Sequence, residues 1–198
     1  MYRVLLVVFA TLAAVNAVTI TNYANRNCGG SARSCSNIGE GRCCYRQGST
    51  FASSKFSGLI NSELGAVCSG TANAQCKTIR KASPGNGCIN PPGPTQRLKG
   101  SYWLNCIIRR KRANCPSVES KEALAQLEGT ESQTGEQVLP DKVIFDGHVF
   151  NINYHVPSNV TEALEYLADG DARYDDVPED LKQFEVTGDA AKEYLESP

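Results

Sequence analysis

The side chains with the most chemistry to offer are nine cysteines, all within the first 115 residues of a 198-residue chain. Clustered cysteines either pair as disulfides or bind zinc. Structural zinc sites draw on closely spaced cysteine pairs and on histidines. This chain has no CxxC pair and no histidine before His148. We therefore expect disulfides and no metal.

The position of the cysteines relative to a basic run predicts how many of them pair. A secreted chain meets oxidising conditions in which thiols form disulfides. Division after Arg112 leaves eight cysteines on one side and Cys115 alone on the other. Because eight is even, we expect four disulfides within residues 18–112, with their connectivity open and Cys115 unpaired. The eight are Cys28, Cys35, Cys43, Cys44, Cys68, Cys76, Cys88 and Cys106.

The basic run Arg109, Arg110, Lys111 and Arg112 has the form that furin-like and kexin-like proprotein proteases cut. Formal charge reverses here. Residues 18–112 carry fourteen Lys and Arg against two Glu, a balance of +12, whereas residues 113–198 carry five against nineteen acids, a balance of −14. Such asymmetry concerns interaction rather than fold. We expect cleavage after Arg112, and the alternative is an uncut cationic patch.

The first residues resemble a secretory leader. Arg3 supplies a positive charge, residues 4–14 are an apolar run, and residues 15–17 form a small-x-small pattern that ends at Ala17. The alternative, a membrane anchor, needs about twenty apolar residues. We expect cleavage after Ala17, with Val18 as the mature N-terminus.

Catalytic and metal-binding constellations are lacking. His148 and His155 lie seven residues apart, which places them on opposite faces of an ideal strand. The segment from Asp169 begins like a calcium loop, but Arg173 and Tyr174 occupy the positions where a ligand and a glycine are required. We expect neither an enzyme nor a bound cofactor.

The basic half has the pattern of a β-rich module. Residues 18–23 alternate apolar and polar side chains, which predicts a strand. Proline and glycine in residues 84–87 and 91–94 exclude helix. A last strand is expected over residues 100–106, and Trp103 within it is interpreted as a core aromatic rather than a ligand platform.

The acidic half has α+β patterning. Two apolar runs within residues 142–154 flank Asp146-Gly147, a pair that accepts the positive φ angles of a hairpin turn. Residues 157–170 have helical periodicity, with Asn159 expected as the N-cap. Asn159 also begins the only N-glycosylation sequon. A shorter helical segment is expected after Pro178.

Four short motifs point to a family. A strand opens on Val18, a double cysteine closes residues 37–44, Phe-x-Ser-x-Lys-Phe-x-Gly-Leu occupies residues 51–59, and Ser-Tyr-Trp ends at Trp103. Together they resemble the small cysteine-rich secreted proteins of fungi with a βγ-crystallin-like, killer-toxin-like Greek-key module. The resemblance covers about half of the chain. It implies no calcium site, because the calcium motif of such modules has no clean match.

We therefore expect a mainly β, disulfide-rich Greek-key module followed by a small acidic α+β region. The expected divisions are a signal peptide (1–17), a basic cysteine-rich module (18–108), a processing site (109–112) and an acidic region with a hairpin and helices (113–198).

Two functions remain in view. The first is a secreted, extracellular, toxin-like or effector-like cationic protein that acts on an anionic membrane surface or an acidic polysaccharide, with its own acidic half as a cleavable pro-region or shield. The second is a structural or carbohydrate-associated protein of the matrix or cell wall. Nucleic acid is not expected as a partner.

Overall fold

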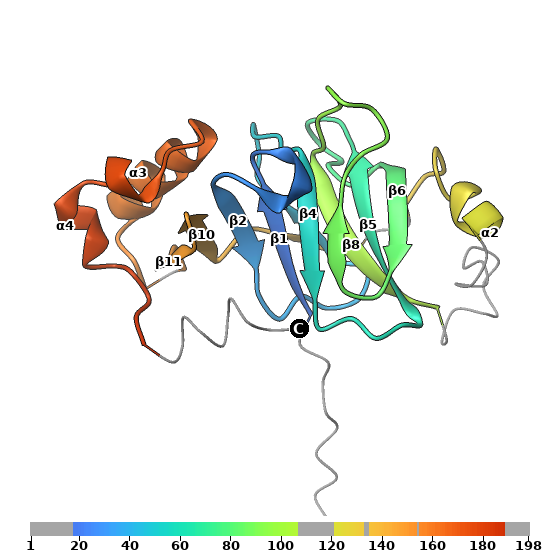
Figure 1. The fold of residues 1–198 in the computed structure, drawn as a ribbon, viewed down its shortest axis with the longest axis horizontal. Helices are drawn as coiled ribbons and strands as arrows, with labels where there is room; N and C mark the ends of the chain where they lie inside the picture. The colour runs from blue at the N-terminus through green and yellow to red at the C-terminus, as the bar shows by residue number, and fades with distance from the viewer. Residues whose placement is uncertain (1–17, 107–120, 133–134, 154, 189–198) are drawn as a thin grey trace, which may run out of the picture.

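The computed structural model describes residues 18–106, 121–132, 135–153 and 155–188, and its architecture is mainly β (Figure 1). One sheet has six strands in the order β11-β10-β2-β1-β4-β7, and the other has five in the order β6-β5-β8-β3-β9. Helices are few and lie outside the two sheets. In the described part of the chain, none of them is long and apolar enough to span a bilayer.

The first sheet consists of β1 (Thr19–Tyr23), β2 (Ala32–Cys35), β4 (Ser53–Ser57), β7 (Gly87–Ile89), β10 (Lys142–Phe145) and β11 (His148–Asn151). The second consists of β3 (Cys43–Tyr45), β5 (Glu63–Ser69), β6 (Thr78–Pro84), β8 (Gly100–Asn105) and β9 (Gln137–Val138). The described helices are α2 (Lys121–Ala125), α3 (Ser158–Asp169) and α4 (Glu179–Lys182), with 3-10 turns η1 (Arg26–Cys28) and η2 (Tyr174–Asp176).

The first eight strands follow one path twice. β1 and β2 pair, β3 crosses to the other sheet, and β4 returns to pair with β1. β5 and β6 then pair, β7 crosses to lie beside β4, and β8 returns to β5. Each run of four strands thus lends its third strand to the other run's sheet, so neither sheet can form completely without the other.

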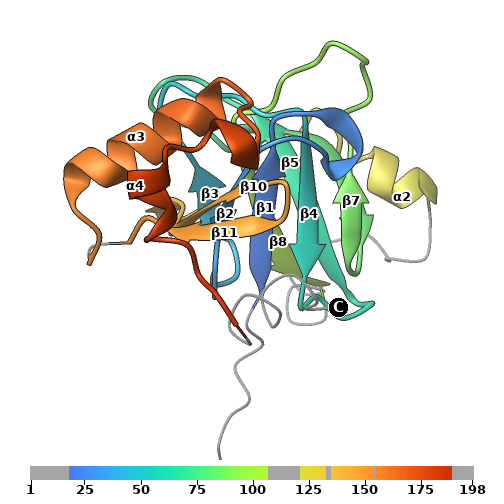
Figure 2. The same ribbon diagram turned by 60° about the vertical axis from the view of Figure 1, so that its left-hand side comes forward.

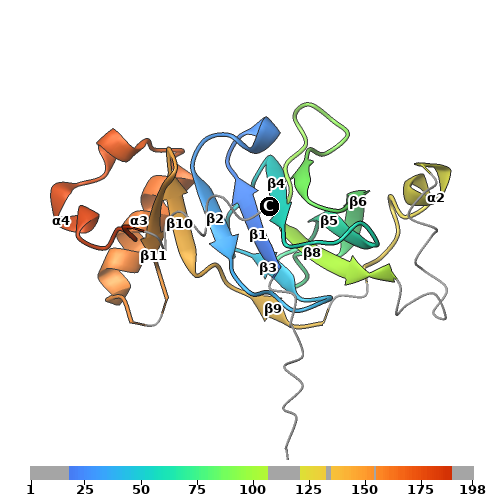
Figure 3. The ribbon, with the colours of Figure 1, turned by 60° about the horizontal axis from the view of Figure 1, so that its bottom comes forward.

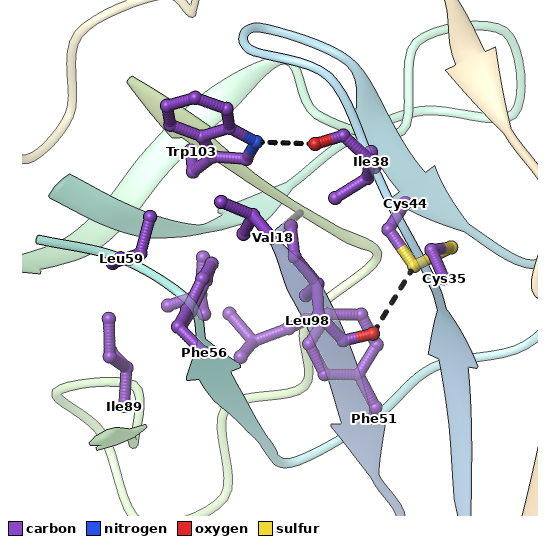
Figure 4. Close-up of a cluster of buried hydrophobic side chains, with 12 residues drawn as sticks. Val18, Cys35, Ile38, Cys44, Phe51, Phe56, Leu59, Ile89, Leu98 and Trp103 are labelled. Atoms are coloured by element: carbon purple, nitrogen blue, oxygen red, sulfur yellow. Dashed lines mark hydrogen bonds between the residues drawn. A yellow bond between two sulfur atoms is a disulfide. The ribbon is translucent and has the colours of Figure 1, made fainter. Parts of the chain in front are cut away.

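The core between the sheets is filled by inward-facing side chains from both (Figure 4). Val18 and Ile20 are fully buried, and the strand expected at residues 18–23 is confirmed as β1. Trp103 lies in the same cluster, where its Nε1 donates a hydrogen bond to the carbonyl oxygen of Ile38 at 2.8 Å. The prediction that Trp103 is a core aromatic is therefore confirmed.

The double cysteine fastens β3 on both of its faces. Neighbouring residues of a strand point to opposite sides of the sheet. Cys44 accordingly pairs with Cys35 of β2 in the core between the sheets. Cys43 pairs with Cys76 in a second apolar cluster, on the opposite face of the five-stranded sheet that contains β3. A third disulfide, Cys28–Cys88, ties η1 to β7.

The expected disulfide set is wrong at Cys68, which is a free, fully buried thiol. Cys68 lies on β5 in the apolar cluster that holds the Cys43–Cys76 bridge, so the cysteines nearest to it are already paired with each other. Burial raises the pKa of its thiol, which keeps it protonated and unreactive. Cys106 is disulfide-bonded, but its partner lies outside the described residues, as does Cys115.

The hairpin expected in the acidic half is confirmed as β10 and β11. Asp146 and Gly147 have φ angles of 50° and 88°, the two positive values that a type I′ turn needs. The hairpin also lengthens the first sheet, because β10 pairs antiparallel with β2 and places Val143 opposite Arg33. On the second sheet, β9 lies parallel to β3 (Figure 3).

Helices α3 and α4 cover the hairpin and share a core with it (Figure 2). Phe145, Phe150 and Leu164 are fully buried in that core. The helix expected at residues 157–170 is confirmed, but its N-cap is Pro157 rather than Asn159. The Pro157 carbonyl accepts the amide hydrogens of Val160 and Thr161, which starts the helix before Asn159 can act as a cap.

Close packing between the sheets requires a glycine at position 65. A Cβ built there would lie 2.7 Å from the Phe56 ring, nearer than side chains approach one another. We expect Gly65→Ala to lower the free energy of unfolding by about 1–3 kcal/mol, the usual cost of overpacking a core. Denaturant unfolding measures it. Gly135→Ala, where a Cβ meets nothing within 4 Å, should change stability little; equal losses in both variants would contradict this packing argument.

The burial of Cys68 gives a second expectation. An alkylating reagent should leave the native, non-reduced protein unlabelled, because the thiol is buried and protonated. The same reagent in denaturant, still without reductant, should add one label, located at Cys68 by peptide mass spectrometry. A label at Cys106 in that sample would refute the assignment of the free thiol.

Candidate functional site

The two halves of the chain meet at a cluster of four charged side chains. Arg33 comes from β2, where it shares a strand face with the core residue Cys35, and Arg46 follows the end of β3. Opposite them, α3 presents Glu165 and Asp169, which lie four residues apart and therefore on one face of the helix. The periodicity of the strand and of the helix thus places two cations and two anions opposite each other.

The cluster is held by short contacts. Arg33 Nη2 lies 2.8 Å from Asp169 Oδ1 and donates a second hydrogen bond to the Glu165 carbonyl oxygen at 2.7 Å. Arg46 Nη2 lies 2.7 Å from Glu165 Oε2. The side chains of Arg33 and Glu165 are 11% and 12% exposed, whereas that of Asp169 is 47% exposed. The cluster is therefore buried at its base and open to solvent at Asp169.

Neither guanidinium uses all of its donors. The Nε atoms of Arg33 and Arg46 are buried and have no hydrogen-bond partner among the described residues. Both arginines line a cavity of about 30 Å³, together with Asn22, Ser49, Phe51 and Arg97. That volume is more than enough to hold a water molecule. An unpaired buried donor costs free energy, so the α3 carboxylates satisfy these arginines only in part.

Burial and charge oppose each other in this cluster. Loss of solvent lowers the pKa of Arg33, and the charges of Asp169 and Glu165 partly restore it. Loss of solvent raises the pKa of Glu165, and Arg46 and Arg33 draw it back down. Each charge is thus tolerable only because the opposite charge is present.

A second set of contacts anchors the end of α3. Asp171 accepts hydrogen bonds from Asn25 Nδ2 at 2.7 Å and from the Ser31 amide at 2.8 Å. Ser31 Oγ donates to the Ala168 carbonyl oxygen at 2.9 Å. The carboxylates that imitate a calcium loop in the sequence therefore hold the helix against β2 and against the segment that connects β1 to β2. Among the described residues, no group of three or more metal-ligating side chains is present.

The other residues singled out from the sequence lie apart from this cluster. Ala17 and the basic run at residues 109–112 are outside the described residues. Asn159 is exposed on the first turn of α3, which leaves its sequon accessible. His148 stacks on Tyr174 with ring centroids 3.5 Å apart, and its Nδ1 lies 2.7 Å from Glu185 Oε1.

Sequence reasoning did not identify the charged cluster, because its members are more than 100 residues apart. One signal was available on each side. Glu165 and Asp169 flank the apolar stripe of a well-marked helix at a spacing of four residues. Arg33 stands between small residues in a short strand, where a cation is unusual. Neither signal identifies the partner.

Comparison with known proteins places a boundary between the two sides of the cluster. The model of a family described as ARB_05566_N, N-terminal domain, matches residues 19–134. No curated protein and no solved structure matches the chain. The matched range contains Arg33 and Arg46 and ends before β10, so both carboxylates of α3 lie beyond it.

The cluster yields a stability prediction. Glu165→Gln should lower the free energy of unfolding of the full chain by about 2–3 kcal/mol, somewhat less than the ~3–5 kcal/mol of a fully buried broken pair. The reason is that Arg46 would remain largely buried without its partner. Denaturant unfolding measures the difference. Glu162→Gln, on the exposed side of the same helix, is the matched control and should change stability by less than about 0.5 kcal/mol. Equal effects would show that Glu165 holds no structural charge pair.

Proposed function

The chain belongs to the ARB_05566_N N-terminal domain family, and on that premise we propose that it is a secreted, cationic, disulfide-linked module whose acidic C-terminal half masks its basic surface. The target of the unmasked module is an anionic surface, and its action is toxin-like or effector-like.

The strand order supports a βγ-crystallin-like fold for residues 18–106. In a Greek-key pair of this kind, two four-strand units exchange one strand each between two packed sheets. The exchange of β3 and β7 between the sheets follows this pattern. Three disulfides between described residues of one small module are typical of extracellular proteins, which supports secretion.

The observation that carries the proposal is the pairing of charges across the two halves. Four ion pairs between described residues join a cation of the basic half to an acid of the acidic half: Arg33–Asp169, Arg42–Glu136, Arg46–Glu165 and Lys77–Glu131. Among the described residues, each ion pair recorded for a basic-half cation is of this kind. The Arg42 and Lys77 pairs are exposed and contribute about 0–1 kcal/mol each. Most of the attachment therefore resides at α3 and at the paired strands.

Cleavage after Arg112 would not by itself separate the halves. β9 and β10 would remain paired with β3 and β2. Cys106 is disulfide-bonded, and the only cysteine outside the described residues is Cys115, on the far side of the basic run. We propose that this bridge keeps the cut chains linked until a reductant breaks it, after which a competing anionic surface displaces the acidic half.

The alternative function, a structural or carbohydrate-associated protein of the matrix or cell wall, has its own support. The acidic half adds strands to both sheets rather than lying on one of them. That arrangement favours two halves that persist as one body. The two functions differ in whether separation exposes a binding surface.

Binding to anionic surfaces before and after separation tests the proposal. A chain with Cys106→Ser and Cys115→Ser would be cut with a kexin-like protease, and its binding to heparin and to phosphatidylcholine–phosphatidylserine vesicles compared with that of the uncut chain. Binding by the cut chain should be about tenfold tighter or more, since each basic residue near an anionic membrane contributes about 1 kcal/mol. The affinity of the cut chain should also fall more steeply as salt is added, because salt screens exposed charges.

The matched control is the same chain with Arg110→Gln and Arg112→Gln, which the protease should leave intact and weakly bound. Wild-type chain, once cut, should migrate as one species without reductant and as two with it. Equal binding by cut and uncut chains, or binding that salt does not change, would reject the shield and favour the structural alternative.

A further inference from the structure

We propose that Arg33 and Arg46 form a binding site for a phosphate monoester group, and that Glu165 and Asp169 of α3 occupy this site as internal substitutes in the intact chain. The inference rests on the proposed masking, because it names the chemistry that the acidic half conceals.

The donor geometry is the first argument. A guanidinium presents Nε and Nη2 along one edge, and this edge fits two oxygens of a tetrahedral oxyanion. Both arginines give Nη2 to a carboxylate and leave the buried Nε without a partner among the described residues. Each edge is therefore half used. A phosphate group that bridged both edges would satisfy the two Nε donors that α3 leaves unpaired.

Charge selects the ligand class. Two carboxylates neutralise two guanidiniums in a largely buried cluster. A replacement must bring a charge near −2, since a buried uncompensated charge is costly. A phosphate monoester carries about −1.5 to −2 at pH 7, whereas a sulfate monoester or a single carboxylate carries one negative charge and would leave one arginine uncompensated.

The surroundings fit a small polar head rather than a long chain. The cavity is about 30 Å³, and Asn22, Ser49 and Thr50 contribute polar side chains to its lining. Ser49 Oγ already donates a hydrogen bond to Asp169 Oδ1 at 2.5 Å, so it is placed to donate to a ligand oxygen at the same position. Asp169 lies at the exposed end of the cluster, which is where a ligand would enter.

Arg97 lines the same cavity but acts as a brace. Its Nη1 donates to the Ala24 carbonyl oxygen at 2.7 Å, and its Nη2 and Nε donate to Thr50 at 3.0 and 3.2 Å. Three of its five N–H groups are therefore engaged with the protein, and every one of its nitrogens already holds the backbone or Thr50. The ligand-binding groups are Arg33 and Arg46.

Inorganic phosphate is the probe that tests the site in the full chain. In the variant Glu165→Gln with Asp169→Asn, α3 keeps its shape while both masking charges are lost. This variant should bind phosphate at pH 7.5 at least about tenfold more tightly than the wild-type chain, and more tightly than it binds methyl sulfate, as titration calorimetry measures. Tenfold corresponds to about one charged hydrogen bond.

Two further substitutions in that unmasked variant identify the site. Arg46→Gln should abolish phosphate binding. Lys55→Gln, which removes a cation that does not line the cavity, should leave it unchanged. If the unmasked variant does not fold, Asp169→Asn alone replaces it, with the shift in melting temperature in phosphate against chloride of equal ionic strength as the readout. Phosphate binding that is equal in wild-type, unmasked and Arg46→Gln chains would overturn the proposal.

Vesicles separate a lipid source of the phosphate from a free one. Phosphatidic acid exposes a phosphate monoester, whereas phosphatidylserine offers a diester and a carboxylate. A lipid ligand predicts that the unmasked variant prefers phosphatidic acid vesicles at matched charge, whereas a free phosphate ester predicts binding of inorganic phosphate without that preference. Binding of cut chain to anionic surfaces, with no response of the unmasked variant to phosphate or to phosphatidic acid, would reject this site and leave the masking intact. If the unmasked variant binds phosphate or phosphatidic acid but cutting does not strengthen binding to anionic surfaces, the masking is rejected and this site remains.

Discussion

The open edge of β2 is the constraint on which the rest of the structure depends. In the sandwich of residues 18–106, β2 is one of the two edge strands of its sheet, and its outer backbone groups need hydrogen-bond partners. β10 supplies them. Because β10 leads through its hairpin into α3, this pairing also fixes which face of the helix meets Arg33. The backbone hydrogen bonds between β10 and β2 set the position of the charged cluster, and the ion pairs then stabilise the same register.

The opposite charges of the two halves form two kinds of ion pair, exposed pairs at the surface and partly buried pairs at α3. At the surface, pairs such as Arg42–Glu136 sit in water and add little beyond a diffuse attraction. At the junction, the same attraction operates with most solvent removed, and each member depends on its partner. The net charges of the halves therefore overstate what the surface pairs contribute and understate what the partly buried cluster at α3 contributes. Asp171 adds two hydrogen bonds at the end of the same helix, to Asn25 and to the Ser31 amide.

Local patterns predicted the elements whose causes are local. The Asp146-Gly147 turn, the amphipathic α3 and the alternation in β1 each lie within a short window, and each is present. Predictions were wrong where the structure depends on a residue far away in the sequence. Cys68 is unpaired because Cys43 and Cys76 bond to each other beside it, and the number of cysteines in the sequence does not reveal this pairing. Asn159 does not cap its helix because the Pro157 carbonyl begins the helix earlier. The charged cluster joins β2 to α3 across more than 100 residues, so neither charge alone indicates its counterpart.

During synthesis, the edge of β2 is formed before the strand that pairs with it. The chain emerges N-terminus first, and Lys142 follows Cys35 by 107 residues. At about 5–20 residues per second, that edge exists without its partner for roughly 5–20 s. An exposed strand edge in this interval invites pairing with a neighbouring nascent chain. The segment that completes the sheet also carries the excess of acids, so its emergence covers the edge and at the same time takes the net charge of residues 18–198 from +12 to −2. Within one chain, the pairing of β10 with β2 thus closes an edge that would otherwise be open to other chains.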